Sequence, residues 1–196
     1  MDSISYALGI VLASNLKNQG FSDINTKELA QGFAESLAGN GKLTVEEADG
    51  KIKEMMMKLQ EEKGAEAKTE GEKFLAENAK NDGIEVTGSG LQYNHETVGE
   101  GEVPTAEDTV TVHYRGTLID GTEFDSSYKR GEPISFPLNG VIPGWTEGLQ
   151  LMKIGGKTKF FIPQELAYGA RPNPNGPIPP FAALIFEVEL IGIKKA

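Results

Sequence analysis

The chain contains no cysteine and only two histidines among its 196 residues. The absence of cysteine excludes disulfide bonds, thiolate metal ligands and a cysteine nucleophile. The histidines, His95 and His113, have no partner at a spacing typical of metal ligands, so we interpret each as a surface or sheet residue. We therefore predict no metal and no cofactor.

An excess of positive charge is also missing. The formal net charge is −10, and neither half of the chain conceals a basic region. Residues 1–90 carry 10 Lys and Arg against 16 Asp and Glu, and residues 91–196 carry 9 against 13. A surface that follows nucleic-acid phosphates needs clustered basic side chains. We therefore predict that nucleic acid is not a partner.

Long apolar runs are absent as well. The longest run near the start, Ile10 to Ala13, is too short for a signal peptide or a membrane span. The sequence thus predicts a soluble protein without a membrane span. We expect a cytoplasmic location, with the periplasm or the cell surface as the alternative if a targeting segment was removed before Met1.

The familiar catalytic motifs are missing too. Gly99-x-Gly101 lacks the third glycine and the following helix of a dinucleotide-binding loop. The chain has no phosphate-binding loop and no Gly-x-Ser-x-Gly turn, and its carboxylates do not pair at a telling spacing. Hydrolase, phosphotransfer and redox functions are therefore disfavoured.

The first part of the chain has helical periodicity. Apolar residues recur at three- and four-residue steps within 4–16, 29–37 and 45–59. The first helix should end near Gly20, and Asn25 and Thr44 should begin the next two because Glu28 and Glu47 complete capping boxes. Residues 3–81 are therefore predicted to be helical.

The third helix changes character after Leu59. From Glu61 to Lys73 it has no large apolar side chain, which predicts a helix solvated on all faces that can kink or fray at Gly64 and Gly71. Glycine-rich turns follow at 81–90. We predict a helical domain over 1–83, with a linking helix over about 44–81, and a second domain over 84–196.

From Leu91 the period is two. Residues 109–118 alternate as a half-buried strand, Asp120-Gly121 predicts a hairpin turn, and further strands are expected at 160–162 and 184–191. Residues 141–145 should lead into a short helix that runs through Met152, with Pro143 at its entry, and the proline-rich segment 169–180 must be loop. The pattern predicts an α+β protein, with an antiparallel sheet wrapped on one short helix behind an all-helical arm.

Four stretches carry a specific resemblance: VHYRGTLIDGTEFDSS, NGVIPGWTEGLQLMKIGGK, IPQELAYGAR and GPIPPFAALIFEVELI. In this order and spacing they resemble the FKBP-type peptidyl-prolyl cis/trans isomerases over residues 91–193. The helical part resembles, in layout, the dimerisation arm of the Mip-like subgroup. The resemblance implies a half-open FKBP-like sheet and an enzyme that accelerates rotation of Xaa–Pro bonds in peptides and folding proteins.

The resemblance also implies a substrate pocket. Trp145 matches the floor of this pocket, and the other matching positions form its walls. The Ile142 backbone N–H and the Tyr168 hydroxyl would bind carbonyls that flank the proline, and no residue is transferred from the tip of the 169–180 loop. The predicted pocket residues are Tyr114, Phe124, Asp125, Phe136, Val141, Ile142, Trp145, Tyr168 and Phe186.

Asp125 and Phe186 each have a plainer explanation. An aspartate before Ser126-Ser127 often satisfies turn amides, and a strand phenylalanine is usually core. The resemblance instead favours a carboxylate at the pocket rim, tied to Tyr114 or Arg130, with an architectural role rather than one in proton transfer.

The implied partners are proline-containing peptides, unfolded or partly folded proteins, and rapamycin-type macrolides as inhibitors. The first two helices have too few large apolar residues to close a core alone, which favours a homodimer through them. They could instead fold back on their own catalytic domain. Three functions compete: an active isomerase, a chaperone or peptide-binding module with incidental turnover, and a dimeric scaffold with a silent pocket.

Overall fold

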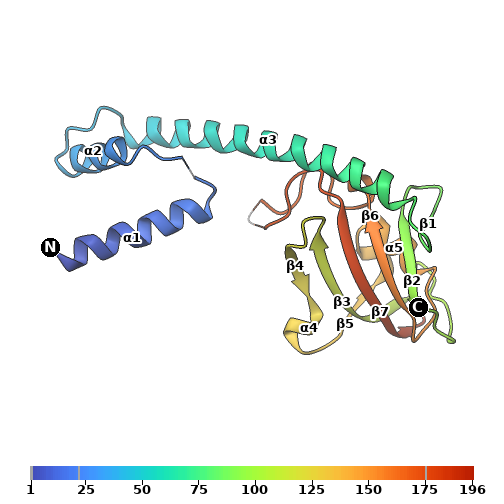
Figure 1. Cartoon of the computed structure of the whole chain (residues 1–196). Coiled ribbons are helices and arrows are strands. Elements are labelled where there is room, and N and C mark those ends of the chain that lie inside the picture. The colour runs from blue at the N-terminus through green and yellow to red at the C-terminus, as the bar shows by residue number, and fades with distance from the viewer. Residues whose placement is uncertain (1, 22, 175) are drawn as a thin grey trace. The chain divides into compact units, whose positions relative to one another are not determined.

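The computed structural model describes residues 2–21, 23–174 and 176–196 (Figure 1). By its internal contacts the chain divides into two compact units, Met1–Glu54 and Met55–Ala196, and the boundary falls inside a long helix. The predicted division into 1–83 and 84–196 concerns which segments fold independently and stays a prediction. Within the described residues, no helix has both the length and the apolar character required to cross a membrane.

Helix starts in the first unit follow the capping signals of the sequence. The Asn25 side chain accepts hydrogen bonds from two backbone N–H groups of the next turn. Thr44 and Glu47 bond reciprocally, with Thr44 N to Glu47 Oε2 at 2.8 Å and Glu47 N to Thr44 Oγ1 at 3.2 Å. These starts were predicted correctly, as was the end of the first helix before Gly20. The helices are α1 (Ser3–Asn18), α2 (Thr26–Leu37) and α3 (Val45–Asn78).

The apolar side chains of α1 and α2 are exposed in the single chain. No described residue of either helix is buried, and Leu8, Leu12, Phe33 and Leu37 are 60%, 44%, 58% and 76% exposed. Amphipathic helices of this length gain most of their stability by packing their apolar face. The two helices therefore leave a substantial apolar surface without a partner from within their own unit.

The second part of α3 departs from the sequence prediction. Instead of a helix solvated on all faces, Gly64, Gly71 and Asn78 are buried, and Ala67 packs against the core of the Met55–Ala196 unit. The helix runs without interruption through both glycines, from Val45 to Asn78. The prediction was wrong because glycine and alanine were counted as solvated residues, whereas their small size permits close packing of one helix face. This part of α3 therefore belongs to the Met55–Ala196 unit and packs within it.

Seven strands form one antiparallel sheet in the order β1-β2-β6-β7-β3-β4, with β5 paired to β3 (Figure 1). The sequence analysis predicted the strands labelled β3, β6 and β7 and the hairpin turn at Gly121, and all are confirmed. Strands β6 and β7 are longer than predicted, and no strand was predicted at β1, β2 or β5. The strands are β1 (Glu85–Val86), β2 (Gln92–Thr97), β3 (Thr109–Leu118), β4 (Glu123–Ser126), β5 (Ile134–Pro137), β6 (Lys157–Ile162) and β7 (Leu184–Lys194).

One short helix, α5 (Pro143–Leu149), packs against β6 of this sheet, and a one-turn helix, α4 (Ser127–Arg130), follows β4. Pro143 lies in the first turn of α5, as predicted, but the helix ends at Leu149 rather than at Met152. An added Cβ at Gly144 would lie 2.5 Å from Ile162 Cγ2, and one at Gly148 2.6 Å from Phe160 Cε1. These two glycines therefore let α5 approach β6 more closely than any side chain would allow, which fixes the depth of the helix.

Candidate active site

Trp145 is the centre of an aromatic cluster above the sheet. Its indole is only 5% exposed, and the rings of Tyr114 and Phe186 meet it edge-on, with centroids 5.1 and 5.0 Å away and interplanar angles of 85° and 84°. Phe136 lies 5.3 Å away at 51°. Among the residues that the structure describes, the buried Trp145 Nε1 has no hydrogen-bond partner. Ring packing alone therefore orients the indole, and such edge-to-face pairs are favourable.

The rings enclose a mainly apolar pocket of about 640 Å³. All nine residues predicted from the sequence line this one pocket, although they come from β3, β4, β5, β7, α5 and the connecting loops. Phe186 is both buried in the core, at 4% exposure, and part of the wall, so the two interpretations of it were compatible. The pocket residues that sequence analysis missed are Ile134, Gly140, Asn173, Gly176, Pro177 and Ile178.

Most of these missed residues lie in the proline-rich loop between Tyr168 and β7. No regular period marks a loop, and the contribution of such a segment depends on how it folds over the sheet. Proline density was the one available signal, since it indicates a segment that is stiff enough to form a wall. Residue 175 of this segment lies outside the described residues.

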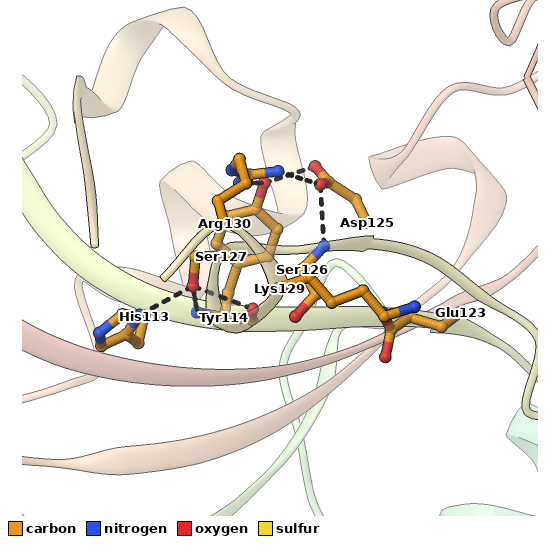
Figure 2. A network of polar contacts seen from close by, with 8 residues as sticks. All are labelled: His113, Tyr114, Glu123, Asp125, Ser126, Ser127, Lys129 and Arg130. Atoms are coloured by element: carbon orange, nitrogen blue, oxygen red, sulfur yellow. Dashed lines mark hydrogen bonds and ion pairs between the residues drawn. The ribbon is translucent and has the colours of Figure 1, made fainter. Parts of the chain in front are cut away.

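A polar network joins the rim of the pocket to β3 (Figure 2). Asp125 accepts a hydrogen bond from the Tyr114 hydroxyl, and Arg130 Nη1 lies 2.5 Å from Asp125 Oδ1. Arg130 Nη2 also donates to the Tyr114 hydroxyl oxygen at 2.7 Å, and the guanidinium lies 5.5 Å from the Tyr114 ring centroid. Asp125 was predicted to bond Tyr114 or Arg130, and it bonds both.

The same aspartate also satisfies its turn. The Ser126 N–H donates to Asp125 Oδ1 at 2.8 Å, so the carboxylate accepts a turn amide as well as bonding Tyr114 and Arg130. Behind it, the buried Ser127 Oγ accepts the Tyr114 N–H at 2.7 Å and lies 3.0 Å from His113 Nδ1 (Figure 2). Ser127 thus fixes the backbone of Tyr114, a role that the sequence analysis did not foresee.

The ionisation of these groups favours a fixed frame over proton transfer. Burial acts to raise the pKa of Asp125, but hydrogen bonds from Tyr114 and Arg130 outweigh it, so that this pKa lies below its usual 3.8. Burial, with the Asp125 charge, raises the pKa of both Tyr114 and Tyr168 above 10.0. At neutral pH the carboxylate is charged and both phenols keep their protons, so none of the three is poised as a general acid or base.

Two hydrogen-bond donors border the apolar walls. Ile142 precedes the first turn of α5, and its backbone N–H has no hydrogen-bond acceptor among the described residues. Tyr168 is 44% exposed and lines the pocket. Because the pKa of its hydroxyl is raised, the hydroxyl keeps its proton at neutral pH. Both groups are therefore able to donate to carbonyl oxygens of a bound peptide. Among residues 2–21, 23–174 and 176–196, no cluster of three His, Cys, Asp or Glu side chains could hold a metal ion.

Comparison with known proteins assigns the family. Residues 100–191 match the model of the FKBP-type peptidyl-prolyl cis-trans isomerases, and residues 1–94 match that of the domain amino terminal to this isomerase. The chain belongs to the FKBP-type peptidyl-prolyl cis/trans isomerases, and it is an enzyme that accelerates rotation about Xaa–Pro bonds.

Its relatives match over nearly the whole chain. It is 45% identical to the FKBP-type isomerase FkpA of Aeromonas hydrophila over 98% of this chain and 75% of that protein. It is 44% identical to the outer membrane protein MIP of Legionella longbeachae over 100% and 86%. The crystal structure of FkpA from Escherichia coli aligns with a TM-score of 0.77 at 39% identity, covering 99% of this chain and 94% of that one. The expected FKBP-like fold with a helical domain in front is thereby confirmed.

The Asp125 network makes a testable electrostatic prediction. In an NMR titration, the Asp125 carboxyl should protonate below 3.8, and in Arg130→Met its pKa should rise because the guanidinium is lost while burial remains. Because the pKa is depressed on folding, the stability contributed by this pair is present above about pH 3.9 and lost as the pH falls through the lower folded value.

Asp120 is the matched control for this titration. Its pKa is also lowered, but by hydrogen bonds from Thr122, so that Arg130→Met should leave it unchanged. An Asp125 carboxyl that titrates at or above its usual value in the parent protein would contradict the network.

Proposed function

We propose that the pocket binds an Xaa–Pro segment with the proline ring flat against the Trp145 indole. Tyr114, Phe136 and Phe186 surround this indole and exclude water from it. The five-membered proline ring suits this indole surface, because the apolar face of the proline ring is similar in width to an indole ring. The observation that carries the proposal is the convergence of all nine predicted residues on one pocket.

An apolar pocket is suited to this reaction because no bond is broken. Rotation about a peptide bond costs about 18–20 kcal/mol, since the planar amide is stabilised by resonance that separates charge between nitrogen and oxygen. The twisted transition state has lost that charge separation, so water stabilises it less than the planar ground state. Removing water therefore favours the twisted state, and a barrier lower by about 4 kcal/mol gives an acceleration of about a thousandfold.

Hydrogen bonds position the chain on either side of the proline. We assign the Ile142 N–H and the Tyr168 hydroxyl to carbonyl oxygens flanking the proline. Bonds of this kind convert binding energy into orientation of the reacting amide. Asp125 acts on the wall, because it holds the Tyr114 hydroxyl and Arg130 in place rather than exchanging a proton.

Isomerase turnover in a proline-tetrapeptide assay tests these roles. Trp145→Ala should lower kcat/KM by about tenfold or more because it removes the floor, and Asp125→Ala should lower it by a smaller factor. Tyr128→Ala is the matched control, since Tyr128 is 47% exposed and its ring stacks on His113 outside the pocket. If Trp145→Ala and Asp125→Ala both keep the parent rate, the pocket assignment is wrong.

The same indole reports on inhibitor binding. We propose that rapamycin-type macrolides occupy this pocket, which is large enough at about 640 Å³ for one part of such a ring. Trp145 is the sole tryptophan of the sequence, so a macrolide lying on it should change the intrinsic fluorescence of the protein. Unchanged fluorescence at saturating macrolide, in a protein that retains turnover, would contradict this placement.

We further propose that α1 and α2 associate with a second copy of the chain, and that the dimer binds unfolded or partly folded clients. The support is the apolar surface of the two helices, on which Leu8, Phe33 and Leu37 are all more than half exposed. Exposed apolar side chains at this density mark an interaction surface rather than a solvated one. A second copy of the chain would cover this surface with the same two helices, in an isologous contact.

Sedimentation at micromolar concentration tests the dimer. The parent chain should sediment as a dimer, and the double variant Leu12→Glu, Phe33→Glu as a monomer, because charges would enter the apolar contact. Lys27→Glu, a charge change in α2 that leaves the apolar residues unchanged, is the control. The monomeric variant should keep turnover on tetrapeptides and lose activity on a refolding protein substrate. A parent chain that sediments as a monomer would refute the dimer.

The compartment is a separate proposal. The name of the Legionella longbeachae relative places that protein in the outer membrane. We therefore favour the periplasm or cell surface, the alternative considered from sequence, over the cytoplasm. Fractionation of the source cells tests this choice, and recovery of the protein with cytoplasmic markers would reverse it.

A further inference from the structure

The buried face of α3 consists of small residues at helical spacing. Gly64, Ala67 and Gly71 are three and four residues apart, so they share one face of the helix. Gly64 and Gly71 are buried, and Ala67 packs against the core. On the opposite faces of the same segment the side chains are charged and exposed. The helix therefore presents a flat strip of backbone to its neighbour within the Met55–Ala196 unit.

That neighbour is the end of the proline-rich loop. A Cβ added at Gly64 would lie 3.1 Å from Pro180 Cβ and 3.4 Å from Phe181 Cδ2. One added at Gly71 would lie 3.1 Å from Ala183 Cβ. Between these points, Lys68 Nζ lies 6.0 Å from the centroid of the Phe181 ring, within the range of a cation–π contact. The helix backbone thus touches the loop from residue 180 to residue 183.

The same loop forms one side of the pocket. Asn173, Gly176, Pro177 and Ile178 line the cavity, and only one residue separates Ile178 from the helix contact at Pro180. A displacement of Pro180 therefore shifts the pocket wall directly, because the prolines leave little backbone freedom to absorb it.

The turn between wall and helix is conformationally strained. Phe181 is the only non-glycine residue with a positive φ among the described residues, at +59°, a conformation that costs about 1–2 kcal/mol for such a side chain. Its N–H donates to the Gly169 carbonyl at 2.8 Å, which joins the two ends of the loop. A strained residue persists only where its surroundings hold it, and here the helix contact and this bond do so.

We propose that Gly64, Lys68 and Gly71 of α3 are positioning residues for substrate: the helix supports the proline-rich loop from behind and so sets the position of the pocket wall that meets the bound peptide. This inference rests on the proposed function of the pocket. The helix that links the arm to the isomerase domain is then also part of the binding machinery. Its effect falls on peptide affinity and on the preference for residues beside the proline, while the rotation step over Trp145 is left unchanged.

The test is a pair of identical substitutions in one helix of the full-length protein. Gly64→Val inserts a side chain against Pro180, whereas Gly50→Val inserts the same side chain where nothing lies within 4 Å. Valine has a higher helix propensity than glycine, so neither change should fray α3. The measurements are KM and kcat for tetrapeptides with different residues before proline, and peptide affinity from Trp145 fluorescence.

We expect Gly64→Val to raise KM and the dissociation constant of the tetrapeptide by about tenfold, with kcat within about twofold of the parent and with altered preference before proline. Gly50→Val should match the parent. If Gly64→Val lowers both kcat and the thermal stability of the protein but leaves KM unchanged, the contact only stabilises the fold. Parent-like KM and preference in Gly64→Val would overturn the proposal.

A methyl exchange provides a second test that does not depend on the tolerance of Gly64. Gly71→Ala should weaken peptide binding because its methyl group, only 3.1 Å from Ala183 Cβ, pushes the loop away from the helix. The double variant Gly71→Ala, Ala183→Gly should restore binding, because one methyl group has moved from the loop to the helix. Failure of this rescue would contradict the proposed contact.

Trp145→Ala separates the two proposals. If this variant loses turnover while Gly64→Val and Gly71→Ala behave like the parent, the pocket assignment stands and the role of α3 fails. If Trp145→Ala keeps the parent rate, the proposed pocket itself is wrong.

Discussion

The site depends on the close approach of α5 to the sheet. Gly144 and Gly148 place the helix backbone against Ile162 and Phe160, where any Cβ would collide. This depth puts the Trp145 ring among the wall aromatics, with no hydrogen bond to direct it among the described residues. Because interiors are packed as densely as organic crystals, such an arrangement is stiff. As the proposed floor of the pocket, a rigid apolar surface suits a reaction without bond cleavage, because such a reaction is accelerated by selecting a geometry.

Polar groups complement this floor without replacing it. Asp125, Tyr114 and Arg130 form a closed set in which each member is bonded to the other two. A network of this kind fixes ring and carboxylate positions at the rim, where solvent would otherwise let the side chains move. The packed aromatic rings thus form the apolar surface of the pocket, and the charged side chains fix the positions of the residues at its rim.

Local patterns predicted much of the fold. Alternation revealed β3 and the core face of β7, and capping residues such as Asn25 and Thr44 located helix starts. The nine pocket residues were found by resemblance, because they lie on separate elements and no spacing connects them. What could not be predicted was contact between segments without periodicity. The burial of Gly64 and the pocket role of Ile178 both depend on the path of a loop, which tertiary packing decides.

Because α3 is one continuous helix, changes in its first part need not affect the contacts that its second part makes with the loop. Each residue of an α-helix adds about 1.5 Å of rise and about 100° of rotation. A single insertion between Glu54 and Gly64 would therefore rotate the preceding turns of α3 about the helix axis, while the contacts of Gly64 and Gly71 keep their register with the loop. Length variation upstream of Gly64 can thus change the first part of the chain without disturbing the wall of the proposed pocket.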